Sequence, residues 1–124
     1  MIPGLTKTFT AEAAVTRRRI CKFGATDSSV LMGAAATDLL MGVSDMSADV
    51  PIGHRCEVRL SGIAEVEFGG AVTRGQPITS DAIGRAVAAA PGAGVNNRLI
   101  GFAMVSAVLG DIGDVFMDLG SIQG

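Results

Sequence analysis

The chain contains one histidine, His54, and imidazole is the side chain that enzymes use most often as a general base. A serine hydrolase would need His54, an acid such as Asp49 and a nucleophilic serine held in one geometry. The sequence has no G-x-S-x-G turn to present such a serine. We therefore interpret His54 as a loop residue beside Gly53, and we predict that the chain is not an enzyme.

Metal and redox chemistry have equally few candidates. A structural zinc site takes four Cys or His ligands, whereas Cys21, Cys56 and His54 are the only such residues in the chain. The two cysteines match no C-x-x-C spacing, so we expect buried, reduced thiols rather than a disulfide. Glu65 and Glu67 could imitate paired carboxylates, but outward charges that keep a strand soluble explain them better. The sequence predicts no metal and no cofactor.

The composition excludes two classes of partner. The formal net charge is −2, which is unfavourable for binding nucleic acid. The longest apolar stretch, residues 99–109, is shorter than the about 20 residues that span a bilayer. No secretory signal is recognisable at the start, and we expect a soluble protein made in the cytoplasm. Neither nucleic acid nor membrane is a predicted partner.

The clearest structural signal is the alternation between Cys56 and Phe68. Six residues with apolar or small side chains share one face, and charged or polar residues dominate the other. The inward set is Val58, Leu60, Gly62, Ala64, Val66 and Phe68. A period of two is typical of a half-buried strand. We expect one long strand here, with a bend at Gly62 where a barrel turns a corner.

Shorter strands separated by glycine surround it. We expect Arg19–Phe23 to be a core strand with Cys21 and Phe23 on one side, and residues 98–108 to be a central strand. Residues 78–79 and 86–87 should pair as a hairpin in which Asp81 caps the turn and Gly84 is left-handed. The alanines at 34–36 are the only helical candidate. The predicted fold is all-β, a small sandwich or barrel of about eight short strands with at most one short helix.

The two ends of the chain differ in character. Residues 1–14 lack a sustained apolar face, so we expect an extended N-terminal arm before a single β domain at 15–124. Residues 1–28 carry a net charge of +3, including the run Arg17-Arg18-Arg19, and residues 99–124 carry −3. Near the C-terminus Phe116 lies between Asp114 and Asp118 on the polar face of the last strand, which suggests contact with a neighbouring subunit.

The order of these segments resembles the small capsid decoration, or cement, proteins of tailed bacteriophages and prophages. The segments are T-K-T-F-T-A-E-A-A-V (6–15), R-R-I-C-K-F-G (18–24), L-L-M-G-V (39–43), I-G-H-R-C-E-V-R-L-S-G-I-A-E-V-E-F-G-G (52–70), A-V-T-R-G-Q-P-I-T-S-D-A-I-G-R-A-V (71–87) and L-I-G-F-A-M-V-S-A-V-L-G-D (99–111). The likeness covers most of the chain and rests on the order and spacing of these segments.

The resemblance implies a non-catalytic module on the outside of a phage head that binds the major capsid protein and stabilises contacts between its subunits. It also implies self-association, for which we favour a trimer over a dimer. An arm reaching onto the shell would suit residues 1–14. The residues that we expect to contact the capsid or another copy are Pro3, Thr6, Lys7, Thr8, Phe9, Arg17, Arg18, Arg19 and Phe116. The alternative is a ligand-binding or tail-associated β module.

Overall fold

The protein, represented by a computed structural model that describes residues 4–124, consists of strands joined by turns and loops, with no helix in that range. The strands are β1 (Thr6–Ala11), β2 (Ile20–Phe23), β3 (Ser29–Met32), β4 (Leu40–Ser44), β5 (Arg55–Arg59), β6 (Gly62–Glu67), β7 (Pro77–Ser80), β8 (Ala86–Ala88), β9 (Asn96–Ala103) and β10 (Ile112–Gln123). The all-β prediction is confirmed, with ten strands instead of about eight.

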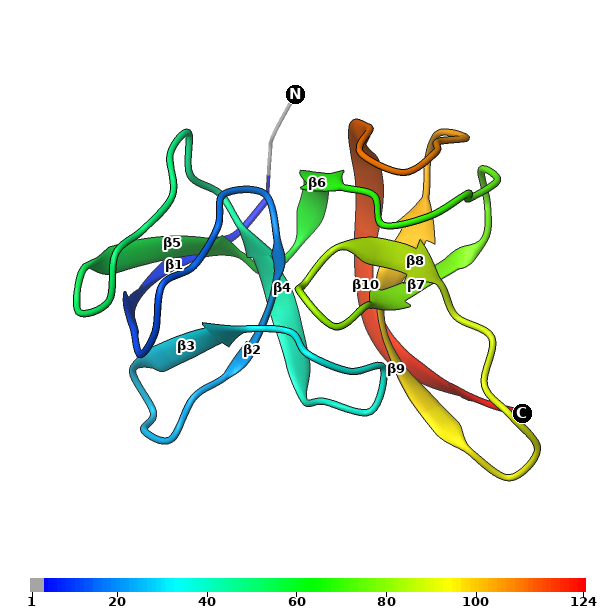
Figure 1. Ribbon diagram of the computed structural model, residues 1–124, viewed down its shortest axis with the longest axis horizontal. Helices are drawn as coiled ribbons and strands as arrows, with labels where there is room; N and C mark the ends of the chain where they lie inside the picture. The colour runs from blue at the N-terminus through cyan, green and yellow to red at the C-terminus, as the bar shows by residue number, and fades with distance from the viewer. Residues whose placement is uncertain (1–3) are drawn as a thin grey trace.

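The strands form two units that lie side by side (Figure 1). The first five strands close into a barrel in the order β1-β3-β2-β4-β5, and β5 returns to pair with β1. The other five form a sheet in the order β6-β10-β9-β7-β8. Closure removes the free edges of the first unit, whereas the second unit is an open sheet whose outer strands meet only at the bridge between Phe68 and Ala86.

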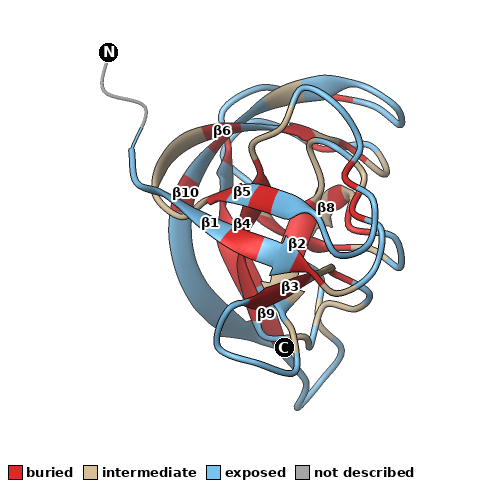
Figure 2. Ribbon diagram, turned by 90° about the vertical axis from the view of Figure 1, so that its left-hand side faces the viewer, coloured by how far each residue is buried: buried red, intermediate tan, exposed pale blue. Residues whose placement is uncertain are grey.

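Two groups of buried side chains hold these units together. One group fills the barrel and includes Phe9, Val30 and Val58. The other lies between the units, where Ile20 and Val43 of the barrel pack with residues of the second sheet. Figure 2 shows buried residues concentrated on the strand segments that face these cores. The shared core joins the barrel and the sheet into one packed body.

The predicted long strand at 56–68 is two strands that belong to different units. The chain leaves the barrel after Arg59 and enters the second sheet at Gly62, which has a φ of 84° that favours glycine. The bend expected at Gly62 is confirmed, but continuity through it is wrong. The predicted inward face holds on both sides of the bend, because Val58 and Val66 are fully buried and Glu65 is exposed.

The hairpin around 78–88 is confirmed in detail. Thr79 pairs with Val87, and the Asp81 carboxylate accepts hydrogen bonds from the backbone N–H groups of Ile83 and Arg85 at 3.0 and 2.8 Å. Gly84 has a φ of 78°, as its left-handed position requires. The helical candidate at 34–36 is instead a turn.

The prediction of an extended arm over residues 1–14 is wrong for the segment Thr6–Ala11. This segment is β1, which pairs antiparallel with β5 along five residues and parallel with β3 at its end. Phe9 and Ala11 point into the barrel and are buried, while Thr6, Thr8 and Thr10 face outwards. Two inward residues are too few to reveal a strand from periodicity, but they are enough to close a small barrel.

Candidate functional site

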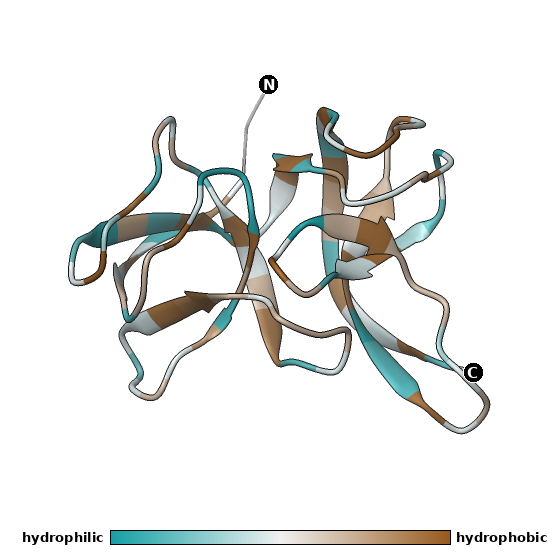
Figure 3. Cartoon of the chain, viewed as in Figure 1, coloured by the Kyte–Doolittle hydropathy of each residue, from teal (hydrophilic) through white to brown (hydrophobic). Residues whose placement is uncertain are grey.

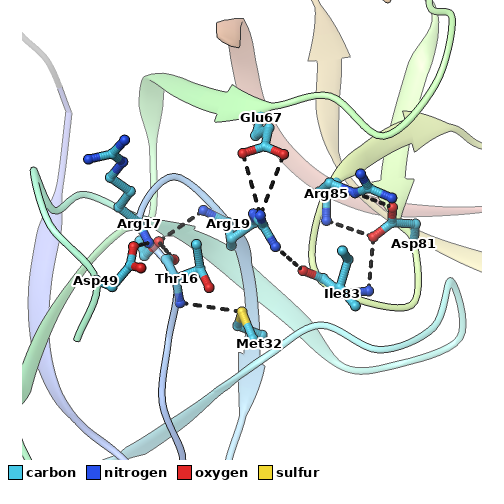
Figure 4. Close-up of polar contacts among 10 residues, drawn as sticks. Thr16, Arg17, Arg19, Met32, Asp49, Glu67, Asp81, Ile83 and Arg85 are labelled. Carbon is cyan, nitrogen blue, oxygen red and sulfur yellow. Dashed lines mark hydrogen bonds and ion pairs between the residues drawn. The ribbon is translucent and has the colours of Figure 1, made fainter. Parts of the chain in front are cut away.

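The basic run predicted as a partner contact lies at the junction of the two units (Figure 4). Arg19 Nη2 lies 3.4 Å from the carboxylate of Glu67 on β6, and its Nη1 donates to the carbonyl oxygen of Ile83 at 2.9 Å. Arg18 Nη1 lies 3.8 Å from Glu65 Oε1. Two of the three arginines are therefore engaged within the chain, between the barrel and the second sheet.

Arg17 behaves differently from its two neighbours. Its side chain is exposed and makes only a long contact, 3.5 Å from Nη1 to the carbonyl oxygen of Ser47. Its backbone N–H donates to the Asp49 carboxylate at 3.1 Å, which fixes the loop but leaves the guanidinium at the surface. Of the predicted basic run, Arg17 alone is exposed, whereas Arg18 and Arg19 are half-buried.

The predicted contact residues near the N-terminus differ in exposure, because β1 is a strand of the barrel. Thr6 and Thr8 are exposed on the outer face of β1, and Lys7 Nζ lies 5.2 Å from the centre of the Phe9 ring. Phe9 is buried, so its assignment as a contact residue is wrong: the ring is needed inside the barrel. Pro3 lies outside the described residues.

Phe116 occupies the position expected of a contact residue, exposed on the outer face of β10. It lies directly opposite Phe102 of β9 on one side and Ile63 of β6 on the other. Directly opposed residues of antiparallel strands point to the same face, so these three side chains form a continuous apolar row. We call Ile63, Phe102 and Phe116 the apolar row. The prediction identified only its central member.

A larger apolar surface lies in the loop between β9 and β10. Five large hydrophobic side chains in this loop and at the start of β10 are at least one third exposed, and Figure 3 shows brown segments there at the end of the second sheet. We call this group the apolar tip; its members are Met104, Val105, Val108, Leu109 and Ile112. Exposed apolar residues gathered in one loop make the apolar tip a candidate interaction surface.

The sequence interpretation missed the apolar tip because it assigned residues 98–108 to a buried central strand. β9 is central in its sheet, as predicted, but it ends at Ala103. The following loop is held by pairing of Val72 with Ala107 and by a hydrogen bond that the backbone N–H of Val108 donates to the Asp111 carboxylate, at 3.0 Å. Gly110, with a φ of 88°, turns the chain before β10, as the sequence predicted.

A shallow groove of about 370 Å³ separates the barrel from the lower part of β9 and β10. Its lining is mixed in polarity and includes Phe23 and Leu40 from the barrel, Arg98 from β9 and Leu119 from β10. Phe23 was predicted to share a buried side with Cys21. Cys21 is fully buried, but Phe23, the last residue of β2, is 53% exposed, so the prediction is wrong for Phe23.

The described residues do not assemble a reactive centre. His54 is exposed in the loop before β5, and no group of three or more His, Cys, Asp or Glu side chains in residues 4–124 could hold a metal ion. Cys21 and Cys56 are free and buried, as predicted. The neighbouring Cys56 thiol and burial both raise the pKa of Cys21, which keeps this thiol protonated. The same part of the chain contains no helix that is long and apolar enough to cross a membrane.

Comparison with known proteins agrees with this arrangement. Over nearly its whole length, residues 2–115, the sequence matches the phage cement protein family. The fold is similar to that of the head fiber gp8.5 N base in bacteriophage phi29, with a TM-score of 0.68, 18% identity, and coverage of 97% of this chain and 98% of that one. No curated protein sequence matches the chain. The chain belongs to the phage cement protein family and is a structural component of the exterior of the phage capsid.

Proposed function

We propose that the protein docks on the shell through its apolar tip and thereby stabilises contacts between neighbouring major capsid subunits, without a catalytic step. The observation that carries this proposal is the exposure of the tip: Val108 and Leu109 are 60% and 62% exposed. Burying such side chains stabilises a complex by about 25 cal/mol for each Å² of apolar surface removed from water.

Because many copies of the protein bind one shell, a modest contact area per copy is sufficient to stabilise the shell. A standard protein interface buries about 1,600 Å² in total, and a small module can supply only part of that area to each subunit that it touches. Many copies on one closed shell act together, because each bound copy stabilises the arrangement that its neighbours also bind. Added contact area is the whole mechanism.

The apolar row of Ile63, Phe102 and Phe116 suits contact between copies of the protein. Its centre, Phe116, is flanked on β10 by Asp114 and Asp118, and the exposed guanidinium of Arg17 offers an opposite charge on a neighbouring copy. For this self-association we favour a trimer and place a dimer next. Light scattering of the free protein, and imaging of decorated capsids, would measure the number of copies that associate.

The docking proposal is tested with a double variant, Val108→Ser with Leu109→Ser. The matched control is Ile52→Ser, because Ile52 is also an exposed apolar loop residue, 67% exposed, but lies in the barrel unit. We expect the double variant to lose cosedimentation with expanded capsids of its own phage, and the control to retain it. Equal binding by the two variants, with native melting temperatures, would refute docking through the tip.

A further inference from the structure

The lower half of β10 has an open edge. β6 pairs with β10 only as far as Met117, whereas β9 continues to pair with it from Gly120 to Gln123. Residues 118–124 are exposed, and Figure 2 shows this part of β10 in pale blue along one side of the molecule. No other strand of the described chain covers the edge beyond Met117. The backbone there can accept an additional strand.

The hydrogen-bonding pattern shows which groups of this edge are free. The N–H of Arg98 points away from β10, because it donates to the carbonyl oxygen of Ala36 at 2.7 Å. Arg98 is paired with Ser121, so this is a pair that does not exchange hydrogen bonds, and the backbone groups of Ser121 also point outwards. The same alternation turns the N–H and C=O of Gln123 outwards. Ser121 and Gln123 thus offer two donors and two acceptors.

The side chains leave this edge unprotected. Exposed edges are commonly blocked by lysine, by proline or by inward-pointing charge. Residues 119–123, L-G-S-I-Q, contain none of these. A bulge between Met117 and Gly120 precedes the edge, and Leu119 beside it is half exposed above the groove that Phe23 also lines. An incoming strand would find both backbone partners and apolar contacts.

We infer that the open edge of β10 binds an extended segment of the capsid shell, which adds to the second sheet as a further strand. This inference rests on the proposed function for the identity of the partner. Strand addition obtains affinity from main-chain hydrogen bonds and specificity from alternate side chains. The Asp118 carboxylate lies at one end of the edge and is exposed, so the segment carries a lysine or arginine toward that end.

A second copy of the protein is a poorer occupant. Its own β10 would bring a second Asp118 and no base within residues 99–124, with Arg98 as the nearest cation. The four outward backbone groups are also too few to hold two copies together in solution, where a stable interface buries about 1,000 Å² or more. A shell segment needs no such area, because many copies bind the same closed surface.

The test compares Ser121→Pro with Ser121→Ala in the full-length protein. Proline removes the outward N–H without breaking a bond to β9, and alanine keeps it. With undecorated expanded capsids of its own phage, we expect Ser121→Ala to bind like the wild type and Ser121→Pro to bind at least tenfold more weakly, with similar melting temperatures. Asp118→Asn should weaken binding severalfold and reduce its dependence on salt.

Three results would overturn the inference. The first is equal capsid binding by natively folded Ser121→Pro and Ser121→Ala. The second is a fall in the oligomer mass of Ser121→Pro measured by light scattering, which would assign the edge to a second copy. If Ser121→Pro melts at a lower temperature than the wild type, Gln123→Pro takes its place, because the N–H of Gln123 also points outwards. The third result is capsid binding by Gln123→Pro that equals that of the wild type. Absence of capsid binding by the wild type would refute the proposed function instead.

Discussion

Phe116 and Phe102 lie directly opposite each other on β10 and β9, and both rings are exposed, at 50% and 38%. The buried neighbours of Phe116 along the strand, Val115 and Met117, point to the opposite face and supply the core. The sheet therefore has one buried face and one exposed face at these positions, and substitutions on the two faces should have separable effects.

Phe116→Ser should weaken self-association or capsid binding more than it lowers stability, because the ring contributes little to the core. We expect a melting temperature within a few degrees of the wild type. Light scattering and capsid cosedimentation would measure association. Unchanged association together with a collapsed melting temperature would contradict the assignment of Phe116 to a contact surface.

Val66→Asp should be severely destabilising, by about 4 kcal/mol or more, because it buries an unpaired charge at a fully buried position. Glu65→Lys on the next position should cost less than about 1 kcal/mol, since the side chain is exposed and its ion pair with Arg18 is long. Thermal and urea melts would compare them. Similar losses in the two variants would mean that the register of β6 is wrong.

Arg19→Gln should lower the free energy of unfolding by about 1–3 kcal/mol, because it removes the contact with Glu67 and weakens the hydrogen bond to Ile83 across the junction. Arg17→Gln, two positions earlier, is the matched control and should change it by less than about 0.5 kcal/mol. Urea denaturation measures both. A larger effect at Arg17 would overturn the division of roles within the arginine run.

Asp38 should make stability depend on pH in the acid range. Burial alone would raise the pKa of this carboxylate, but hydrogen bonds from the Ala34 N–H, Lys22 and the Ala35 N–H outweigh it and lower the pKa from 3.8. A lowered pKa in the folded state adds stability above the unfolded value, and that stability is lost as the pH falls through the folded value. Asp38→Asn should flatten the dependence of melting temperature on pH below about pH 4. An unchanged profile would exclude this contribution.

Deletion of residues 1–10 should prevent folding of the barrel, because it removes most of β1 and leaves β5 and β3 without their shared partner. The interpretation of these residues as an arm predicted the opposite, a nearly unchanged melting temperature. Circular dichroism and a thermal melt of the truncated protein would decide between them. A cooperative melt near the wild-type temperature would instead support the interpretation of residues 1–10 as an arm.

The sequence predicted those elements whose side chains alternate without interruption. The buried positions of β5 and β6, the 78–88 hairpin and the exposure of Phe116 all follow from local patterns. It failed where the chain departs from regular alternation. Phe23 is exposed at the end of β2, and the bend at Gly62 divides one pattern between two sheets.

In the candidate site too, the sequence predicted local features and missed those that depend on contacts between distant residues. Arg18 and Arg19 look free in the sequence, because their partners Glu65 and Glu67 are distant along the chain and approach only when the two units pack. The apolar tip looks like a core strand, because local composition cannot separate an apolar loop from a buried strand. Both errors concern long-range arrangement, which composition does not encode.

The length of β10 has a mechanical consequence. This strand continues for twelve residues, about 40 Å at 3.3 Å per residue, from the apolar tip to the open edge near the C-terminus. A swelling shell that gripped both ends would pull along the strand axis. The hydrogen bonds to β6 and β9 lie perpendicular to that axis, so they would resist the load together in shear rather than open one after another. β10 would then carry the tensile load between the apolar tip and the open edge, the two places where the protein is held.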